Sequence, residues 1–171
     1  MAPQDVFRRT VDAVPLPPEN IAGLVLAMVL DRIRPWPIPG PRGLQRPLGG
    51  ALMAAGALTA GWATAERPEP DLERPMRITT SGPYRFSRNP MYVGWHLIHL
   101  GAALCGGSTW RLLTLVAAVM RVHRGIRDEE VEMAARFHAE FARYADKVPR
   151  YVPPRFRGQL VRDLTAGSDK D

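Results

Sequence analysis

Two stretches of the chain carry side chains that could bind a polar ligand. The first motif, residues 82–95, holds Gly-Pro and Asn-Pro dipeptides before an apolar run, which predicts a turn leading into a helix. Arg88 could face an anion, while Tyr84 and Tyr92 could stack on a flat ring. Gly94 would leave room for a ligand beside the helix. The same residue types also anchor helices at a membrane interface, so the spacing leaves both interpretations open.

The second motif, residues 124–150, holds paired carboxylates near the start of a predicted helix. Glu129 and Glu130 follow Arg124 and Arg127, and Tyr144 comes later on the same helix. The carboxylates could bind a ligand or could serve only the helix macrodipole, and both interpretations remain open.

Histidine and cysteine usage bears on metal binding. His96 and His99 stand three residues apart on a predicted helix, but no third ligand is evident. We therefore expect no metal site. The single cysteine, Cys105, excludes an internal disulfide and argues against a thiolate zinc site.

Composition favours one domain that contacts an anionic partner. The 171 residues are 46% hydrophobic, enough to bury one core. The 23 Lys and Arg residues outnumber the 17 Asp and Glu, and the net charge of +6 suits an anionic membrane surface or a nucleic acid. The mean hydropathy of −0.17 conceals a segregation of apolar blocks from segments rich in Arg, Glu and Pro.

The apolar blocks predict about four membrane helices that position the two motifs. Residues 48–64 carry no charge and are rich in Gly and Ala, which permits close helix approach in a bilayer. Residues 93–120 predict two helices joined by a turn at 106–108. The block at 21–30 is short, and the Arg-rich connection after it suggests that it is re-entrant or only partly embedded. Burial of these short helices in a soluble helical domain is the alternative.

The remaining segments are predicted to be polar. Residues 66–88 read as a loop, and a long helix with apolar positions three and four apart follows Val122 and ends at Pro149. We expect a single domain over residues 1–153 and a polar tail over 154–171.

Together, the two motifs resemble those of the integral-membrane methyltransferases related to isoprenylcysteine carboxyl methyltransferase and phospholipid N-methyltransferase. The resemblance covers roughly residues 45–153 and rests on matching positions in both motifs: Gly82, Pro83, Tyr84, Arg88, Asn89, Pro90, Tyr92, Gly94, Glu129, Glu130, Met133, Phe137, Phe141, Tyr144, Val148 and Pro149.

The chain departs from the family pattern at several positions. Asn89 stands where the eukaryotic carboxyl methyltransferases have His, and resembles the common bacterial variant. His138 replaces a glycine after Phe137, and Phe141 replaces a tyrosine. The arginine that often precedes the first glutamate by four residues falls at Gly125, so Arg124 or Arg127 would have to take its role.

The resemblance implies S-adenosylmethionine as the cofactor. It implies carboxylates for the cofactor's amino group or ribose hydroxyls, an arginine for its carboxylate, and tyrosines for its adenine or sulfonium. The resemblance thereby implies the following cofactor-binding residues: Tyr84, Arg88, Asn89, Tyr92, Gly94, Arg124, Arg127, Glu129, Glu130 and Tyr144. An ammonium acceptor would need a catalytic base, for which Glu130 or His96 could serve.

These inferences together predict an all-α polytopic membrane domain with a cytosolic C-terminal helix that closes over the cofactor. We expect methyl transfer to a lipophilic acceptor, with membrane lipids but no nucleic acid as partners. Arginine-rich loops place both motifs on the cytoplasmic face of a bacterial inner membrane. A membrane reductase of the sterol-reductase type and a non-catalytic membrane scaffold are the alternatives.

Overall fold

The computed structural model describes residues 17–67 and 77–151. These residues form four α-helices and one 3₁₀ turn: α2 (Pro18–Ile33), α3 (Arg42–Ala65), η1 (Gly82–Arg85), α4 (Pro90–Gly106) and α5 (Thr109–Lys147). Within this part of the chain the β-structure amounts to one isolated bridge between Pro37 and Ser108. The predicted all-α fold class is therefore confirmed there, whereas the polar tail at 154–171 lies outside the described residues.

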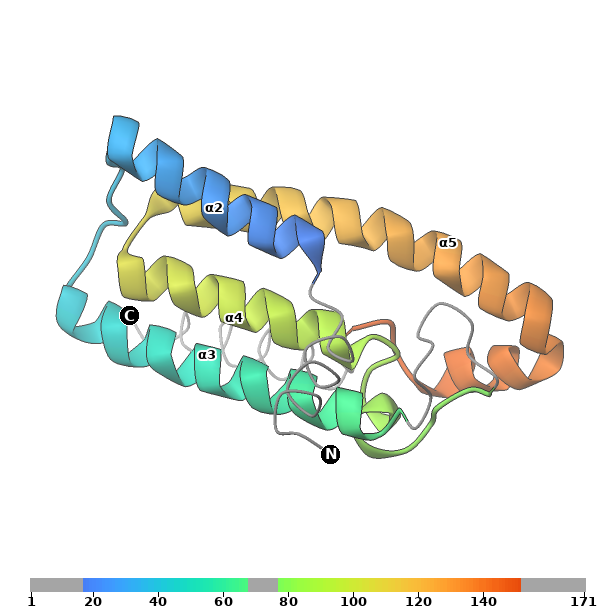
Figure 1. Ribbon diagram of the computed structural model, residues 1–171. Helices are drawn as coiled ribbons and strands as arrows, with labels where there is room; N and C mark the ends of the chain where they lie inside the picture. Colours follow the sequence, from blue (N-terminus) through green and yellow to red (C-terminus); the bar gives the residue numbers. More distant parts are fainter. Residues whose placement is uncertain (1–16, 68–76, 152–171) are drawn as a thin grey trace, which may run out of the picture.

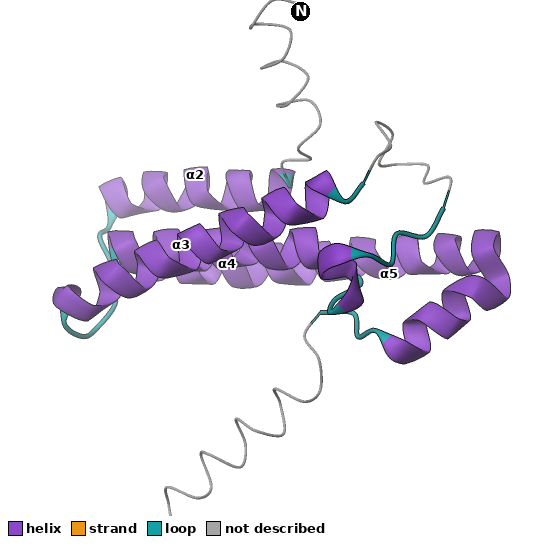
Figure 2. Cartoon of the chain, turned by 90° about the horizontal axis from the view of Figure 1, so that it is seen from below, coloured by secondary structure: helices purple, strands orange, loops and turns teal. Residues whose placement is uncertain are grey.

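The four helices run back and forth along one axis. Figure 1 shows α3 and α4 side by side, with α2 packed chiefly on α5. The connections 34–41 and 107–108 lie at one end of the bundle, and Figure 2 shows the α3–α4 connection at the other end. Both sequence motifs lie at this second end.

Prolines and a left-handed glycine set the helix boundaries. Pro18 and Pro90 begin α2 and α4, because the fixed φ of proline suits the first helical turn. Gly107, at a φ of 58°, ends α4, and the Ser108 hydroxyl accepts a hydrogen bond from the Arg111 N–H to cap α5. The predicted turn between the two apolar helices is thus confirmed.

Glycines let α3 and α4 approach backbone to backbone. A Cβ added to Gly56 would lie 2.5 Å from the Gly94 carbonyl oxygen, and one added to Gly49 would lie 2.6 Å from that of Gly101. Side chains larger than hydrogen cannot fit at these two crossings. The four glycines form what we call the glycine seam.

The bundle buries small side chains and exposes large ones. Its most buried apolar residues include Ala27, Ala63, Ala103 and Ala118, whereas large apolar side chains lie exposed on three helices, among them Ile21, Val25, Leu26, Leu48, Leu58, Trp62, Val116 and Met120. A water-soluble bundle would bury the large residues, so this distribution favours apolar surroundings.

One described helix, α3, is long and apolar enough to cross a bilayer. It has 24 residues, and only 22% of its most apolar window is buried inside the protein, unlike a soluble core helix. The helix begins at Arg42, earlier than the predicted block at 48–64, and continues through Pro47. Helices α2 and α4, at 16 and 17 residues, are shorter than the roughly 20 residues that a bilayer requires.

Helix α5 differs from the prediction of two separate elements. Its 39 residues join the second apolar arm to the helix predicted after Val122. Gly125 lies close to the predicted boundary at Val122. A glycine costs a helix roughly 1 kcal/mol but does not break it. The chain instead turns at His138, at φ 43° and ψ −118°. We call the part beyond this turn, residues 139–147, the roof helix.

Candidate functional site

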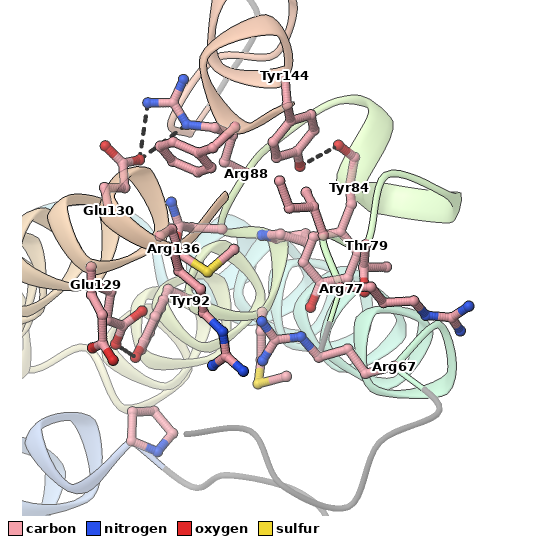
Figure 3. A pocket seen from close by; sticks show the side chains of 18 of the residues that line it. Arg67, Arg77, Thr79, Tyr84, Arg88, Tyr92, Glu129, Glu130, Arg136 and Tyr144 are labelled. Carbon is pink, nitrogen blue, oxygen red and sulfur yellow. Dashed lines mark hydrogen bonds and ion pairs between the residues drawn. The ribbon is translucent and has the colours of Figure 1, made fainter. Parts of the chain in front are cut away.

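A cavity of about 520 Å³ lies at the end of the bundle that holds both motifs (Figure 3). The start of α2, the α3–α4 connection, the start of α4 and both parts of α5 contribute to its wall. Six of the residues predicted to bind a ligand line it: Tyr84, Arg88, Asn89, Tyr92, Glu129 and Glu130, and Tyr144 joins them from the roof helix. The fold thus brings two motifs about forty residues apart to one place.

Tyr92 and Glu129 meet across the cavity. The Tyr92 hydroxyl donates a hydrogen bond to Glu129 Oε1 at 3.1 Å, joining the start of α4 to α5. Desolvation by the surrounding protein raises the pKa of the Glu129 carboxyl above its ordinary value, while the bond from Tyr92 and the charge of Arg67 offset part of that rise. Glu129 keeps solvent contact on its open side. Its carboxylate is therefore accessible to a ligand.

Glu130 lies beside Glu129 but is held by two arginines. Arg88 approaches Oε1 with Nε at 3.0 Å and Nη2 at 2.9 Å, and Arg150 approaches Oε2 with Nε at 3.0 Å and Nη2 at 2.5 Å. Desolvation alone would raise the pKa of Glu130, but the bonds from Arg150 and Arg88 lower it below its ordinary value. Glu130 is therefore held by its ion pairs, and its role as a catalytic base stays a prediction. We call these three residues the Glu130 cluster.

Asn89 lies at the N-cap position of α4 without capping it. Its side chain makes no bond to the first turn of the helix, and Nδ2 instead donates to the carbonyl of Arg150 at 3.2 Å. Arg88 likewise reaches the far end of the chain, because Nη1 donates to the carbonyls of Ala145 and Val148 at 2.9 Å. The first motif therefore holds the end of the second motif.

The roof helix covers the cavity with aromatic side chains. Phe141 is buried, and the Tyr144 hydroxyl donates to the main-chain carbonyl of Tyr84 at 2.8 Å (Figure 3). On the other side of Tyr84, the guanidinium of Arg67 lies 5.6 Å from the ring centroid. The cavity thus combines flat aromatic surfaces with charged groups of both signs.

Four predicted residues do not line the cavity. Arg124 and Arg127 lie exposed on α5, outside its wall. Gly94 faces α3, where a Cβ would meet the Gly56 carbonyl oxygen at 2.7 Å, so its small size serves helix packing rather than a ligand. His96 lies one helical turn further along α4 than Tyr92, and its buried Nε2 has no hydrogen-bond partner in the structure.

Three arginines outside the predicted set of binding residues line the cavity instead. Arg67 and Arg77 flank the α3–α4 connection, and Arg136 lies on α5. Arg136 follows Glu129 by seven residues, with Met133 between them, and this helical spacing could have identified it. No comparable pattern marks Arg67 or Arg77, which lie outside the helices.

Metal binding finds no support in this part of the chain. Among residues 17–67 and 77–151, no group of three or more His, Cys, Asp or Glu side chains is placed to hold a metal ion. His99 is fully buried, and its Nε2 lies 3.3 Å from the Thr114 hydroxyl.

Comparison with known families agrees with this geometry. The family model for phospholipid methyltransferases matches residues 45–140, which is more than half of the chain and includes both glutamates and the first motif. No significant match was found among curated proteins or among solved structures. The matched family supports a membrane methyltransferase. On this evidence, the chain belongs to the phospholipid methyltransferase family.

Proposed function

We propose that the cavity binds S-adenosylmethionine and that the protein transfers a methyl group from it to a lipophilic acceptor. The observation that carries this proposal is the accessible Glu129 carboxylate, bonded to Tyr92 in a cavity that also contains several arginines. A volume of about 520 Å³ lies within the range of roughly 300–1,000 Å³ that is usual for small-molecule sites.

The residues of the cavity suit each part of this cofactor. Glu129 would accept hydrogen bonds from its amino group or ribose hydroxyls, and Arg67 or Arg136 would bind its carboxylate. The rings of Tyr84 and Tyr144 offer flat surfaces for the adenine. When bound, the cofactor supplies a methyl group on a positively charged sulfur.

The protein's part in the reaction is to align the acceptor and to exclude water. The roof helix closes one side of the cavity, and the side chains beneath it would hold the acceptor atom in line with the methyl group. The bound cofactor would supply the methyl group by cleavage of its carbon–sulfur bond, with the electron pair of that bond left on sulfur. A carboxylate acceptor requires no base in this reaction. An ammonium acceptor would need a base, and because Glu129 is assigned to the cofactor, Glu130 and His96 remain the candidates for that role.

We also propose that this end of the bundle faces the cytoplasm of a bacterial inner membrane. The α3–α4 connection and the end of α5 are rich in arginine and lie together at the cavity end. Residues 31–47, which include the connection 34–41, lie at the opposite end of the bundle. They carry fewer arginines than the α3–α4 connection and the end of α5 do together.

Cysteine labelling in intact cells would test this orientation. In a background with Cys105→Ser, Arg34→Cys should react with a membrane-impermeant maleimide, and Arg85→Cys should react only after lysis. Both side chains are exposed, at opposite ends of the bundle. Labelling of Arg85→Cys in intact cells would reverse the proposed orientation.

Binding of S-adenosylhomocysteine by the detergent-purified protein would test the cofactor. We expect the wild type to bind this product and Glu129→Gln to bind it about tenfold more weakly or worse, because a charged hydrogen bond would be lost. Glu140→Gln is the matched control, since Glu140 lies exposed on α5 outside the cavity. A reductase would bind a nicotinamide dinucleotide instead, and a scaffold would bind neither ligand.

A further inference from the structure

The end of the described chain is fastened across the first motif. The backbone N–H of Arg88 donates to the Pro149 carbonyl at 2.9 Å, and the Ser87 hydroxyl donates to the Arg150 carbonyl at 3.2 Å. The hydroxyl of Tyr151 also lies 2.7 Å from Nδ1 of His123 on α5. These contacts fix the main chain where the roof helix ends.

The side chain of Arg150 adds a tie of a different kind. Each oxygen of Glu130 faces two N–H groups of a single guanidinium, Arg88 on one side and Arg150 on the other. Arg88 precedes α4, Glu130 belongs to the long part of α5, and Arg150 follows the roof helix. One carboxylate thus joins three segments that surround the cavity.

Burial makes this shared carboxylate sensitive to the loss of a partner. The side chains of Glu130 and Arg88 are only 14% and 13% exposed, so water reaches this ion pair poorly. If Arg150 were absent, Oε2 of Glu130 would lose both of its donors. The roof helix would then be tied to the first motif only by the remaining hydrogen bonds.

Arg150 does not itself line the cavity, whereas Glu130 and the roof residues Phe141 and Tyr144 do. It also lies beyond the residues that match the family model. An effect of Arg150 on a ligand must therefore pass through the Glu130 cluster and the roof helix.

We propose that Arg150 is a positioning residue that sets how tightly the roof helix closes over the cavity and so how long the ligand stays bound. This inference rests on the proposed function for the nature of the ligand. Loosening a closed cover speeds ligand escape more than ligand entry, so the effect falls on the dissociation rate.

Stopped-flow binding of S-adenosylhomocysteine to the detergent-purified full chain would test the proposal. We expect Arg150→Gln to raise the dissociation rate about tenfold or more, with the binding stoichiometry unchanged. Arg150→Lys should give an intermediate rate, because an ammonium keeps the charge but cannot donate from two nitrogens at once. Arg143→Gln, an exposed change on the roof helix, should behave as the wild type does.

Two outcomes would overturn the proposal. One is a wild-type dissociation rate in Arg150→Gln. The other is a reduced stoichiometry with an unchanged rate, which would mean that Arg150 only helps the protein to fold. If Arg150→Gln fails to fold, Arg150→Lys decides the matter, and a wild-type rate in that variant counts against the proposal.

Hydrogen exchange separates this proposal from the proposed function. Amides of residues 139–147 should exchange faster in ligand-free Arg150→Gln than in the wild type, and unchanged exchange would overturn the positioning role. If the wild type does not bind S-adenosylhomocysteine, the proposed function fails, and the exchange measurement still decides whether Arg150 holds the roof helix.

Discussion

The turn at His138 leads to the most direct prediction about stability. The residue has φ 43° and ψ −118°, a conformation that side chains with a Cβ rarely adopt. Such a residue costs about 1–3 kcal/mol, and a glycine there avoids that strain. Glycine itself costs about 0.5–1 kcal/mol through the greater freedom of the unfolded chain. His138→Gly should therefore stabilise the protein by about 1 kcal/mol.

Thermal unfolding in detergent would measure this change. For a chain of 150–250 residues, 1 kcal/mol corresponds to a rise of about 2–4 °C in Tm. The imidazole of His138 is exposed, so its removal should sacrifice little packing. Ala139→Gly is the matched control, because it places the same residue one position later in a regular helix and should lower Tm. An equal or lower Tm for His138→Gly would show that the turn is not strained.

Three further predictions concern helix packing and the two glutamates. Gly49→Ala should destabilise the bundle by about 1–3 kcal/mol, since its Cβ would lie 2.6 Å from the Gly101 carbonyl oxygen. Gly50→Ala, which has open space around it inside α3, should raise Tm slightly, because alanine favours a helix more than glycine does. Affinity for S-adenosylhomocysteine should fall as the pH is lowered, with a midpoint above the ordinary carboxyl pKa of 4.5, because burial raises the pKa of Glu129. Calorimetry at several pH values should find no such fall in affinity for Glu129→Gln. The pKa of Glu130 is lower in the folded than in the unfolded protein, so its ion pairs stabilise the fold above pH 4.5 and are lost as the pH falls below that value. Wild-type Tm should accordingly drop more steeply below pH 4.5 than that of Glu130→Gln, and parallel curves would contradict this assignment.

The sequence predicts the helices more reliably than their lengths. Apolar blocks and their flanking prolines locate α2, α3 and α4, because these signals are local. The extent of α5 is less accessible: a change from apolar to polar residues after Val122 suggests a boundary, but the helical backbone continues across it. The apolar and polar parts of α5 differ in their surroundings, but both keep a helical backbone.

The sequence likewise predicts part of the candidate site. Tyr92, Glu129 and Tyr144 are recognisable because their motifs have fixed spacings, and the fold brings them together. Which of the two glutamate carboxylates stays open to a ligand is harder to predict. Glu129 and Glu130 are neighbours in sequence but have different hydrogen-bond partners. One partner of Glu130, Arg150, lies twenty residues further along the chain. Such a distinction depends on tertiary contacts that no local pattern encodes.

The glycine seam restricts which parts of the protein can move. Its two crossings, Gly49 with Gly101 and Gly56 with Gly94, are seven residues apart on both helices, or about 10 Å along the axis. A slide of α4 by one turn would bring a larger residue against each glycine, so both crossings would be lost at once. The register of α3 against α4 is therefore locked at two points. A piston-like displacement of these helices cannot open the cavity, and any route for a ligand that needs movement must use the segments beyond the seam.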